Sequence, residues 1–173
     1  MNVLASSSSG IAHGLLTIHA APQSLCAHID WSISDVFGQP FRGDWKKQPL
    51  KIGHYRLEIP WQGKCGAAAR LASTLAGWEF LYFEITQVAA LGSEGEFYRF
   101  TPQLKMHHST INSFGEIVVS ENQILTSISQ CREPALVQEK MCELLGTSWE
   151  DELEPFRIAL RENELDFEDK MSV

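Results

Sequence analysis

The stretch "WEFLYFEITQV", residues 78–88, constrains the fold more than any other part of the sequence. It is rich in β-branched and aromatic residues, which is typical of a strand whose side chains alternate between two faces. Both faces are then apolar, one made by Leu81, Phe83 and Ile85 and the other by Trp78, Phe80 and Tyr82. A sheet that contains this strand must be covered on both sides. The two predicted helices before this strand cover one face of the sheet, so only residues after 90 are available to cover the other face.

The segments before this strand predict a ferredoxin-like βαββαβ unit. Apolar alternation and helical periodicity indicate, in order, strands and helices at 14–20, 22–37, 41–47, 54–61, 64–77 and 78–88. The order strand, helix, strand, strand, helix, strand is that of the split βαβ arrangement. In the first helix, Ile29, Ile33 and Val36 recur on one face that should contact the sheet. We therefore predict an α+β protein whose first half is ferredoxin-like.

Residues 97–160 are predicted to add extra strands and a helical C-terminal extension that packs on the second face. Ser120 and Gln123 form a capping-box pattern that opens a helix, and Pro134 suits the first turn of another. We expect the apolar stripe of the first of these helices to point inward, namely Ile124, Leu125, Ile128 and Cys131. This extension would complete one domain rather than form a second.

The last helix of the extension opens at a second capping-box pattern, Thr147 with Glu150. Pro155 disfavours helix at the residue before it, so we expect a kink or two short helices. Trp149, Leu153 and Phe156 offer one apolar side. The predicted organisation is a disordered N-terminal tail, a single α+β domain and an acidic mobile tail, with the boundaries 1–10, 11–161 and 162–173.

Composition excludes several classes of protein. The chain of 173 residues has a net charge of −8, and residues 148–173 carry nine acidic against three basic residues. No basic stripe exists, so we expect no nucleic-acid partner. No apolar run reaches the roughly 18 residues that span a membrane, so we expect no membrane partner. Four cysteines without a C-x-x-C pattern fit reduced thiols and a cytoplasmic location.

The stretch "LTIHAAPQSLCAHIDW", residues 16–31, brings a thiol and imidazoles close together in sequence. On an ideal helix Cys26 and His28 project about 200° apart, so they cannot bind one ion from that helix. His19 would need a distant second donor, and no zinc spacing is present. We therefore predict no metal and no cofactor. Cys26 is either a thiolate activated near the helix start or a small buried hydrophobe.

Trp31 lies opposite the apolar face of the same helix, with His28 one turn before it. An outward tryptophan is unusual on a solvated helix. Either the C-terminal extension covers Trp31, or Trp31 and His28 mark a contact surface. The first reading is slightly favoured.

The run "MHHSTIN" also places two histidines together. In a strand, His107 and His108 point to opposite faces and are no chelate. His108 shares its face with Met106 and should be packed, whereas His107 shares its face with Lys105 and should be exposed. No nucleophile elbow, phosphate loop, dinucleotide fingerprint or metalloprotease motif is present, so no catalytic residue is predicted.

The sequence resembles an actinobacterial protein family of unknown function over about residues 14–160. The runs that carry the resemblance are "HAAPQSLCAHIDW", "WQGKCGAAARLASTLAGWE", "TPQLKMHHS", "NSFGEIVV" and "LLGTSWEDELEPFR". The residues that it marks are His19, Cys26, His28, Trp31, Trp61, Arg70, Trp78, His108 and the stretch 149–157. The resemblance implies no established activity, and it suggests a link to fatty-acid metabolism. His107 departs from the aromatic or apolar residue expected there.

Two hypotheses about function follow. The first is a cytoplasmic, non-catalytic binding or adaptor protein with a protein partner and a contact surface drawn from His19, Cys26, His28, Trp31 and His108. The alternative is a small enzyme with an unfamiliar site that uses His19, Cys26, His28 or His108. Geometry discriminates between them, because an enzyme needs two such groups to converge within hydrogen-bond reach. The sequence sets no oligomeric state.

Overall fold

The computed structural model describes residues 10–89, 94–131 and 133–171, with side chains as far as Ala159. The predicted N-terminal tail, 1–10, lies outside these residues except for Gly10. The strands are β1 (Ile11–Pro22), β2 (Lys46–Lys47), β3 (His54–Lys64), β4 (Tyr82–Gln87), β5 (Gly95–Thr101), β6 (Lys105–Ile111) and β7 (Ile117–Val118). The helices are the 3-10 turn Gln23–Leu25, α1 (Cys26–Phe37), α2 (Ala67–Leu75), α3 (Glu121–Gln130), α4 (Pro134–Leu145) and α5 (Thr147–Met171).

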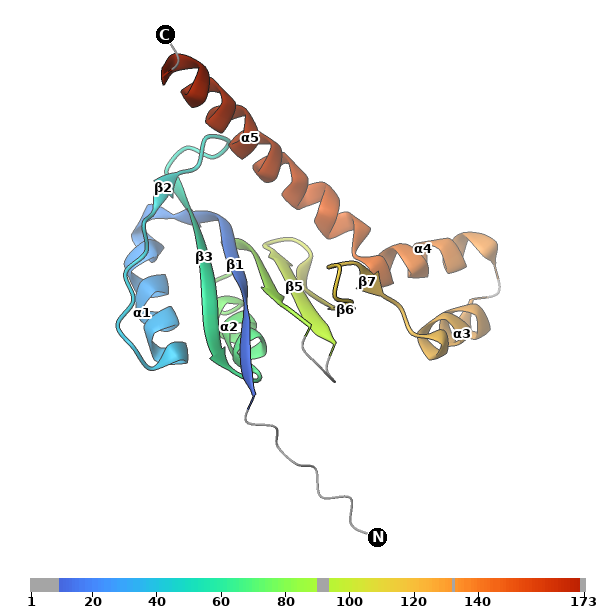
Figure 1. The fold of residues 1–173 in the computed structure, drawn as a ribbon. Coiled ribbons are helices and arrows are strands. Elements are labelled where there is room, and N and C mark those ends of the chain that lie inside the picture. Colours follow the sequence, from blue (N-terminus) through green and yellow to red (C-terminus); the bar gives the residue numbers. More distant parts are fainter. Residues whose placement is uncertain (1–9, 90–93, 132, 172–173) are drawn as a thin grey trace.

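The described strands form one sheet in the order β2-β3-β1-β4-β5-β6-β7 (Figure 1). Every neighbouring pair is antiparallel. The long strand β1 lies inside the sheet between β3 and β4. The chain is therefore a mixed α+β protein, as the alternation of strand and helix patterns predicted.

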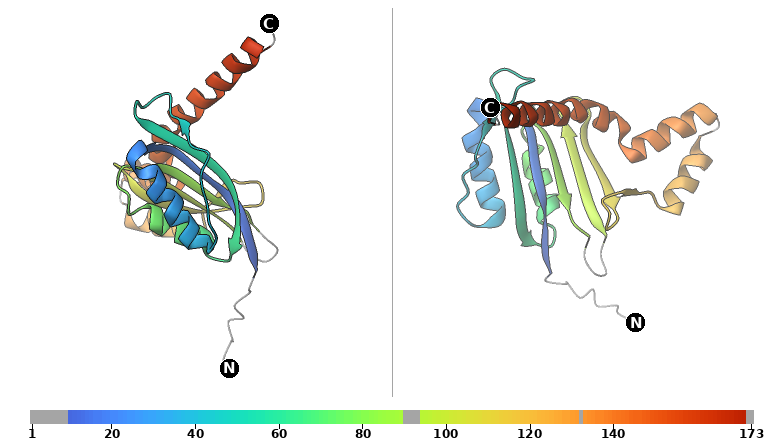
Figure 2. Two further views of the ribbon diagram at one scale, coloured as in Figure 1. Left: turned by 90° about the vertical axis from the view of Figure 1, so that its left-hand side faces the viewer. Right: turned by 45° about the horizontal axis from the view of Figure 1, so that its top comes forward.

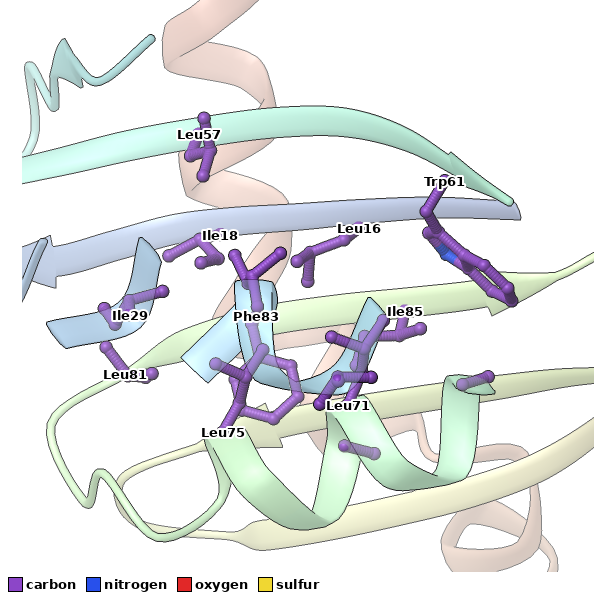
Figure 3. Close-up of a cluster of buried hydrophobic side chains, with 14 of the residues drawn as sticks. Leu16, Ile18, Ile29, Leu57, Trp61, Leu71, Leu75, Leu81, Phe83 and Ile85 are labelled. Atoms are coloured by element: carbon purple, nitrogen blue, oxygen red, sulfur yellow. The ribbon is translucent and has the colours of Figure 1, made fainter. Parts of the chain in front are cut away.

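The first face of the sheet is covered by α1 and α2. Helix α1 buries Ile29, Ile33 and Val36, which confirms the predicted apolar face. In α2 the small residues Ala68 and Ala72 are buried, so that helix can lie close to the strands. Figure 3 shows the resulting core, to which β1, β3 and β4 contribute the labelled residues Leu16, Ile18, Leu57, Trp61, Phe83 and Ile85.

The second face of β4 differs from the prediction. The strand begins only at Tyr82, so Trp78 and Phe80 lie in the turn before it. Trp78 packs against the first-face core, and the side chain of Phe80 is 66% exposed. Only Tyr82 packs on the second face, against Phe156 of α5 with ring centroids 5.0 Å apart. The strand is thus not apolar on both faces.

Helix α5 covers part of the second face, as expected of the C-terminal extension. Leu153, Phe156 and Ala159 are its buried apolar residues. Of the two alternatives expected at Pro155, two short helices are wrong, because α5 is one helix from Thr147 to Met171 with Pro155 inside it, and a kink stays a prediction. Buried side chains on both sides of the proline hold the helix on the sheet and compensate for the missing backbone donor. Residues 162–171 of the predicted acidic tail continue this helix.

Helices α3 and α4 project beyond β7, away from the rest of the sheet (Figure 2). The capping box of Ser120 and Gln123 is confirmed. The expected inward packing of the α3 stripe is wrong, because Ile124, Leu125 and Ile128 are 38%, 56% and 53% exposed. α3 buries Ser127 instead, and no described residue of α4 is buried. The buried apolar cover of the second face in the described chain is thus made by α5, and α4 adds only contacts of its last backbone carbonyls.

Candidate functional site

A row of polar side chains crosses the second face of the sheet. In the ladder Thr17 of β1 pairs with Glu84 of β4, Glu84 pairs with Arg99 of β5, and Arg99 pairs with His107 of β6. Residues paired in this way project from the same face, because side chains alternate along each strand. Three of the four carry or can carry a charge. This row, rather than an apolar surface, is what α5 meets.

Glu84 is the most strongly held residue of the row. Its carboxylate accepts a hydrogen bond of 2.7 Å from His19 Nε2 and two from Arg157, at 2.6 Å from Nη2 and 3.2 Å from Nε. Burial of Glu84 opposes its charge, but the hydrogen bonds from His19 and Arg157 outweigh burial and hold its pKa at about 2. Glu84 is therefore a buried carboxylate that stays ionised at neutral pH.

Arg157 joins this carboxylate to two others on its own helix. Its Nη1 donates to Glu154 Oε2 at 2.7 Å and also to Glu150. Burial alone would lower the pKa of the Arg157 guanidinium, but the hydrogen bonds to Glu84 and Glu150 raise it. Charge-assisted pairs of this kind fix geometry strongly, because the planar guanidinium presents its donors in a rigid fork.

Arg99 extends the same arrangement toward β6. The residue is 2% exposed, and its Nη2 donates to the carbonyl of Leu145 at 2.7 Å and to His107 Nδ1 at 3.2 Å. Its Nη1 donates to Glu150 Oε2 at 3.3 Å. Burial lowers the pKa of Arg99, and Glu150 offsets that effect in part. Gly146 permits this approach, since a Cβ there would collide with the guanidinium.

His107 is fixed as one tautomer by its partners. Arginine only donates, so Nδ1 accepts from Arg99, and Nε2 carries the hydrogen that points to the carbonyl of Glu143 at 3.0 Å. Burial and the charge of Arg99 lower the pKa of His107. The ring also packs on Trp149, whose Nε1 donates to the carbonyl of Lys105 at 2.9 Å. We call Glu84, Arg99, His107, Glu150 and Arg157 the α5 network.

A cleft of about 570 Å³ lies beside the α5 network. We call it the β3 cleft; its lining residues are Leu15, Thr17, Ile18, His19, Asp44, Lys46, Arg56, Leu57, Glu58, Glu84 and Arg157. Two buried nitrogen atoms on its lining residues, His19 Nδ1 and Arg56 Nε, have no hydrogen-bond partner among the described residues. Buried polar atoms usually have a hydrogen-bond partner, so two such atoms without one beside the same cleft need an explanation.

The predicted site residues do not meet at one place. His19 is buried in the sheet beside Glu84. Cys26 begins α1, where its thiol donates to the carbonyl of Pro22, and burial followed by the charge of Asp30 raises the thiol pKa. The thiolate reading of Cys26 is therefore disfavoured.

His28 and Trp31 lie on the outward side of α1. The ring of His28 packs on Trp78 with centroids 5.9 Å apart, and Trp31 is 76% exposed. The slightly favoured expectation, that the extension covers Trp31, is wrong for the described chain. α5 lies over the other face of the sheet.

The two neighbouring histidines are reversed relative to the prediction. His107 is 8% exposed, whereas His108 is exposed and stacks on Tyr98 with centroids 4.4 Å apart. His108 does share the first face with Met106, but it remains exposed beside Tyr98, whereas Trp149 and the end of α4 cover His107 on the second face. The pairing of His107 with Arg99 needs the strand register, which the sequence does not state.

The described residues contain no group of three or more His, Cys, Asp or Glu side chains placed to hold a metal ion. The absence of a metal stays a prediction, which elemental analysis of the purified protein tests. All four cysteines are free thiols. Among the described helices none is both long and apolar enough to cross a membrane.

Fold and site together define an α+β protein whose sheet carries a core on one face and a charged helix network on the other. The chain belongs to the family described as "Protein of unknown function (DUF3145)", which matches residues 15–169. No curated protein and no solved structure matches the chain significantly. The family run "LLGTSWEDELEPFR" coincides with the end of α4 and the part of α5 that holds the network.

Proposed function

We propose that the protein is a cytoplasmic, non-catalytic binding or adaptor protein that docks a protein partner through the outward side of α1. The observation that carries this proposal is Trp31, which is 76% exposed on a regular helix. His28 lies one turn before it and packs on Trp78, which extends the aromatic surface. We call His28, Trp31 and Trp78 the α1 surface. Exposed aromatic residues of this kind dominate the binding energy of many interfaces.

The state of the ionisable groups favours binding over catalysis. Glu84, Arg99 and Arg157 are occupied by one another and by the other groups of the α5 network. The thiol of Cys26 has a raised pKa and is no activated nucleophile. A general base and a nucleophile within hydrogen-bond reach of each other are therefore missing from the predicted residues.

The test is the variant Trp31→Ala with Ile52→Ala as a matched control. Ile52 is 98% exposed on the turn before β3, so both changes remove an exposed apolar side chain. Both variants should keep native stability within about 0.5 kcal/mol. In affinity capture from the native cell, quantified by mass spectrometry, Trp31→Ala should lose the proteins that native protein and Ile52→Ala retain. The link to fatty-acid metabolism implied by the family resemblance predicts metabolic enzymes among them.

Equal capture by the two variants would remove the α1 surface from the proposal. A large drop in the stability of Trp31→Ala would mean that Trp31 has a structural role instead. Capture by neither the native protein nor the variants would count against an adaptor.

The enzyme alternative retains one specific support. His19 and Glu84 form an imidazole–carboxylate pair at 2.7 Å beside the β3 cleft, an arrangement that can orient a general base. The described contacts of Cys26, His28 and His108 are with Pro22, Trp78 and Tyr98 and not with this pair. Turnover of a metabolite mixture by the native protein, lost in His19→Gln at unchanged stability, would favour the enzyme.

We also infer that β1, α1, β2, β3, α2 and β4 form a ferredoxin-like unit within a single domain of residues 11–161. Support comes from the order β4-β1-β3-β2, from its antiparallel neighbours and from the placement of α1 and α2 on one face. An experimentally determined structure in which these strands pair in another order would contradict the inference.

A further inference from the structure

We propose that the β3 cleft binds a small polar molecule through a carboxylate or phosphate group held by Arg56 and Lys46. Arg56 and Lys46 are direct partners in the β2–β3 ladder, so their side chains leave the same face of the sheet. The side chain of neither forms an ion pair or a hydrogen bond with any described residue, and both residues line the cleft. Two neighbouring unpaired cations repel one another unless an anion lies between them.

The burial of Arg56 points in the same direction. Its Nε atom is buried and has no acceptor among the described residues. An unpaired buried donor is costly, and for a charged group the cost is larger than for a neutral one. Arg157, the second guanidinium that lines the cleft, is already paired with Glu84, Glu150 and Glu154. Arg56 is therefore the guanidinium left for a ligand, and its planar fork fits a carboxylate or phosphate.

The same cleft supplies acceptors for the rest of the molecule. Glu58 and Asp44 line the cleft and form no ion pair with Lys46 or Arg56 within the described chain. His19 also lines the cleft; it is 1% exposed, its Nε2 donates to the Glu84 carboxylate, and its Nδ1 has no hydrogen-bond partner among the described residues. These groups suit hydroxyl or amino hydrogens.

The size and composition of the cleft set the ligand class. A volume of about 570 Å³ suits a small molecule. The ligand needs an anionic group for Arg56 and Lys46 and hydrogen-bond donors for the acceptors of the cleft. A hydroxy acid, an amino acid or a sugar phosphate carries both. A long apolar chain does not, because charged and polar side chains line most of the cleft.

The experiment is calorimetric titration of the full chain with inorganic phosphate and, in a second arm, with L-malate as a hydroxycarboxylate. Native protein should bind at least one probe saturably, with a Kd of about 1 mM or tighter. Arg56→Gln should weaken that binding about tenfold or more. Lys47→Gln is the matched control, because Lys47 is the next residue of β2, pairs with Tyr55 and leaves the opposite face. The control should keep the affinity within about twofold.

Binding of neither probe overturns the proposal, and so does equal weakening by Arg56→Gln and Lys47→Gln, which would reflect overall charge only. If Arg56→Gln does not fold, Lys46→Gln replaces it, because Lys46 is exposed. Tighter binding of phosphate than of malate assigns the ligand to the phosphates, and the reverse assigns it to the carboxylates. Trp31→Ala should leave both affinities unchanged, so the cleft and the α1 surface succeed or fail separately.

Discussion

Two parts of the C-terminal extension carry similar amphipathic patterns and end in different environments. Helix α5 buries Leu153 and Phe156 against the sheet and forms hydrogen bonds to it through the α5 network. The pair α3–α4 buries only Ser127 among its described residues, and Leu125 of α3 is 56% exposed. Both parts form regular α-helices, so local helix formation does not distinguish them.

The difference lies in what the sheet offers to each helix. Under α5 the sheet presents Glu84, Arg99 and the carbonyl of Lys105, which meet Arg157, Glu150 and Trp149 with matched donors and acceptors. The end of α4 offers the sheet only the backbone carbonyls of Glu143, Leu144 and Leu145, which accept from His107 and Arg99, and no described hydrogen bond joins α3 to the sheet. A helix is thus placed by specific complementary groups on its neighbour, and an apolar stripe alone does not ensure cover.

The largest effect is expected from removing α5. Truncation after Gly146 exposes the surface under Leu153 and Phe156, each worth roughly 1.5–3 kcal/mol of burial. It also leaves Glu84 and Arg99 without their α5 partners. We expect an unstable, aggregation-prone product in urea unfolding monitored by circular dichroism. Truncation after Glu162 is the control and should be tolerated, because the described side chains of α5 that are buried on the sheet all remain in this fragment.

Cooperative unfolding of fragment 1–146 with near-native stability would break the comparison. α5 would then be a separate docking arm, no more integral to the domain than α3 and α4.

A smaller effect, about 3–5 kcal/mol, is expected for Arg157→Met, because breaking a buried ion pair leaves its partner charged and unsatisfied. The partner here is Glu84, whose side chain is 11% exposed. Arg70→Met is the matched control. Arg70 is exposed on α2 and has no described ion pair, so its replacement should cost less than about 0.5 kcal/mol. Equal losses in urea unfolding would mean that the α5 network adds nothing to stability.

The sequence predicts the first face of the sheet well. Ile29, Ile33 and Val36 repeat at helical spacing, and the small residues of α2 mark a helix close to strands. The final family run also identified the region of the α5 network, although not its chemistry. Burial of Leu153 and Phe156 follows from the apolar side that they share.

The features that the sequence does not predict depend on the strand register and on where each strand begins and ends. The burial of His107 follows from its pairing with Arg99, a contact between two strands that no local pattern specifies. Phe80 is exposed because β4 starts two residues later, at Tyr82. An error of one residue in the predicted register moves every side chain of a strand to the opposite face. The burial of side chains such as His107 and Phe80 is therefore the feature that the sequence predicts least well.

The pH dependence of stability sharpens the comparison further. The pKa of Glu84 is lowered to about 2, below its ordinary value of 4.5. A carboxyl with a lowered folded pKa contributes stability that is present above about pH 4.5 and is lost as the pH falls toward 2. Its contribution at neutral pH is about 3 kcal/mol.

Urea unfolding of native protein and Glu84→Gln between pH 7 and pH 2.5 measures this contribution. The difference in free energy of unfolding should be largest at neutral pH and should shrink below pH 4.5. Parallel curves over that range would show that Glu84 is not the titrating group.

The smallest effect is expected at the exposed pair of helices. Leu125→Ser removes an apolar side chain that is 56% exposed on α3, so the free energy of unfolding should change by no more than about 0.5 kcal/mol. Leu153→Ser is the matched substitution on α5, where the side chain is fully buried, and it should cost at least about 2–5 kcal/mol. Urea unfolding of both variants at one protein concentration gives the comparison directly. If Leu125→Ser is as costly as Leu153→Ser, α3 is covered in solution and the contrast between the two parts of the extension is lost.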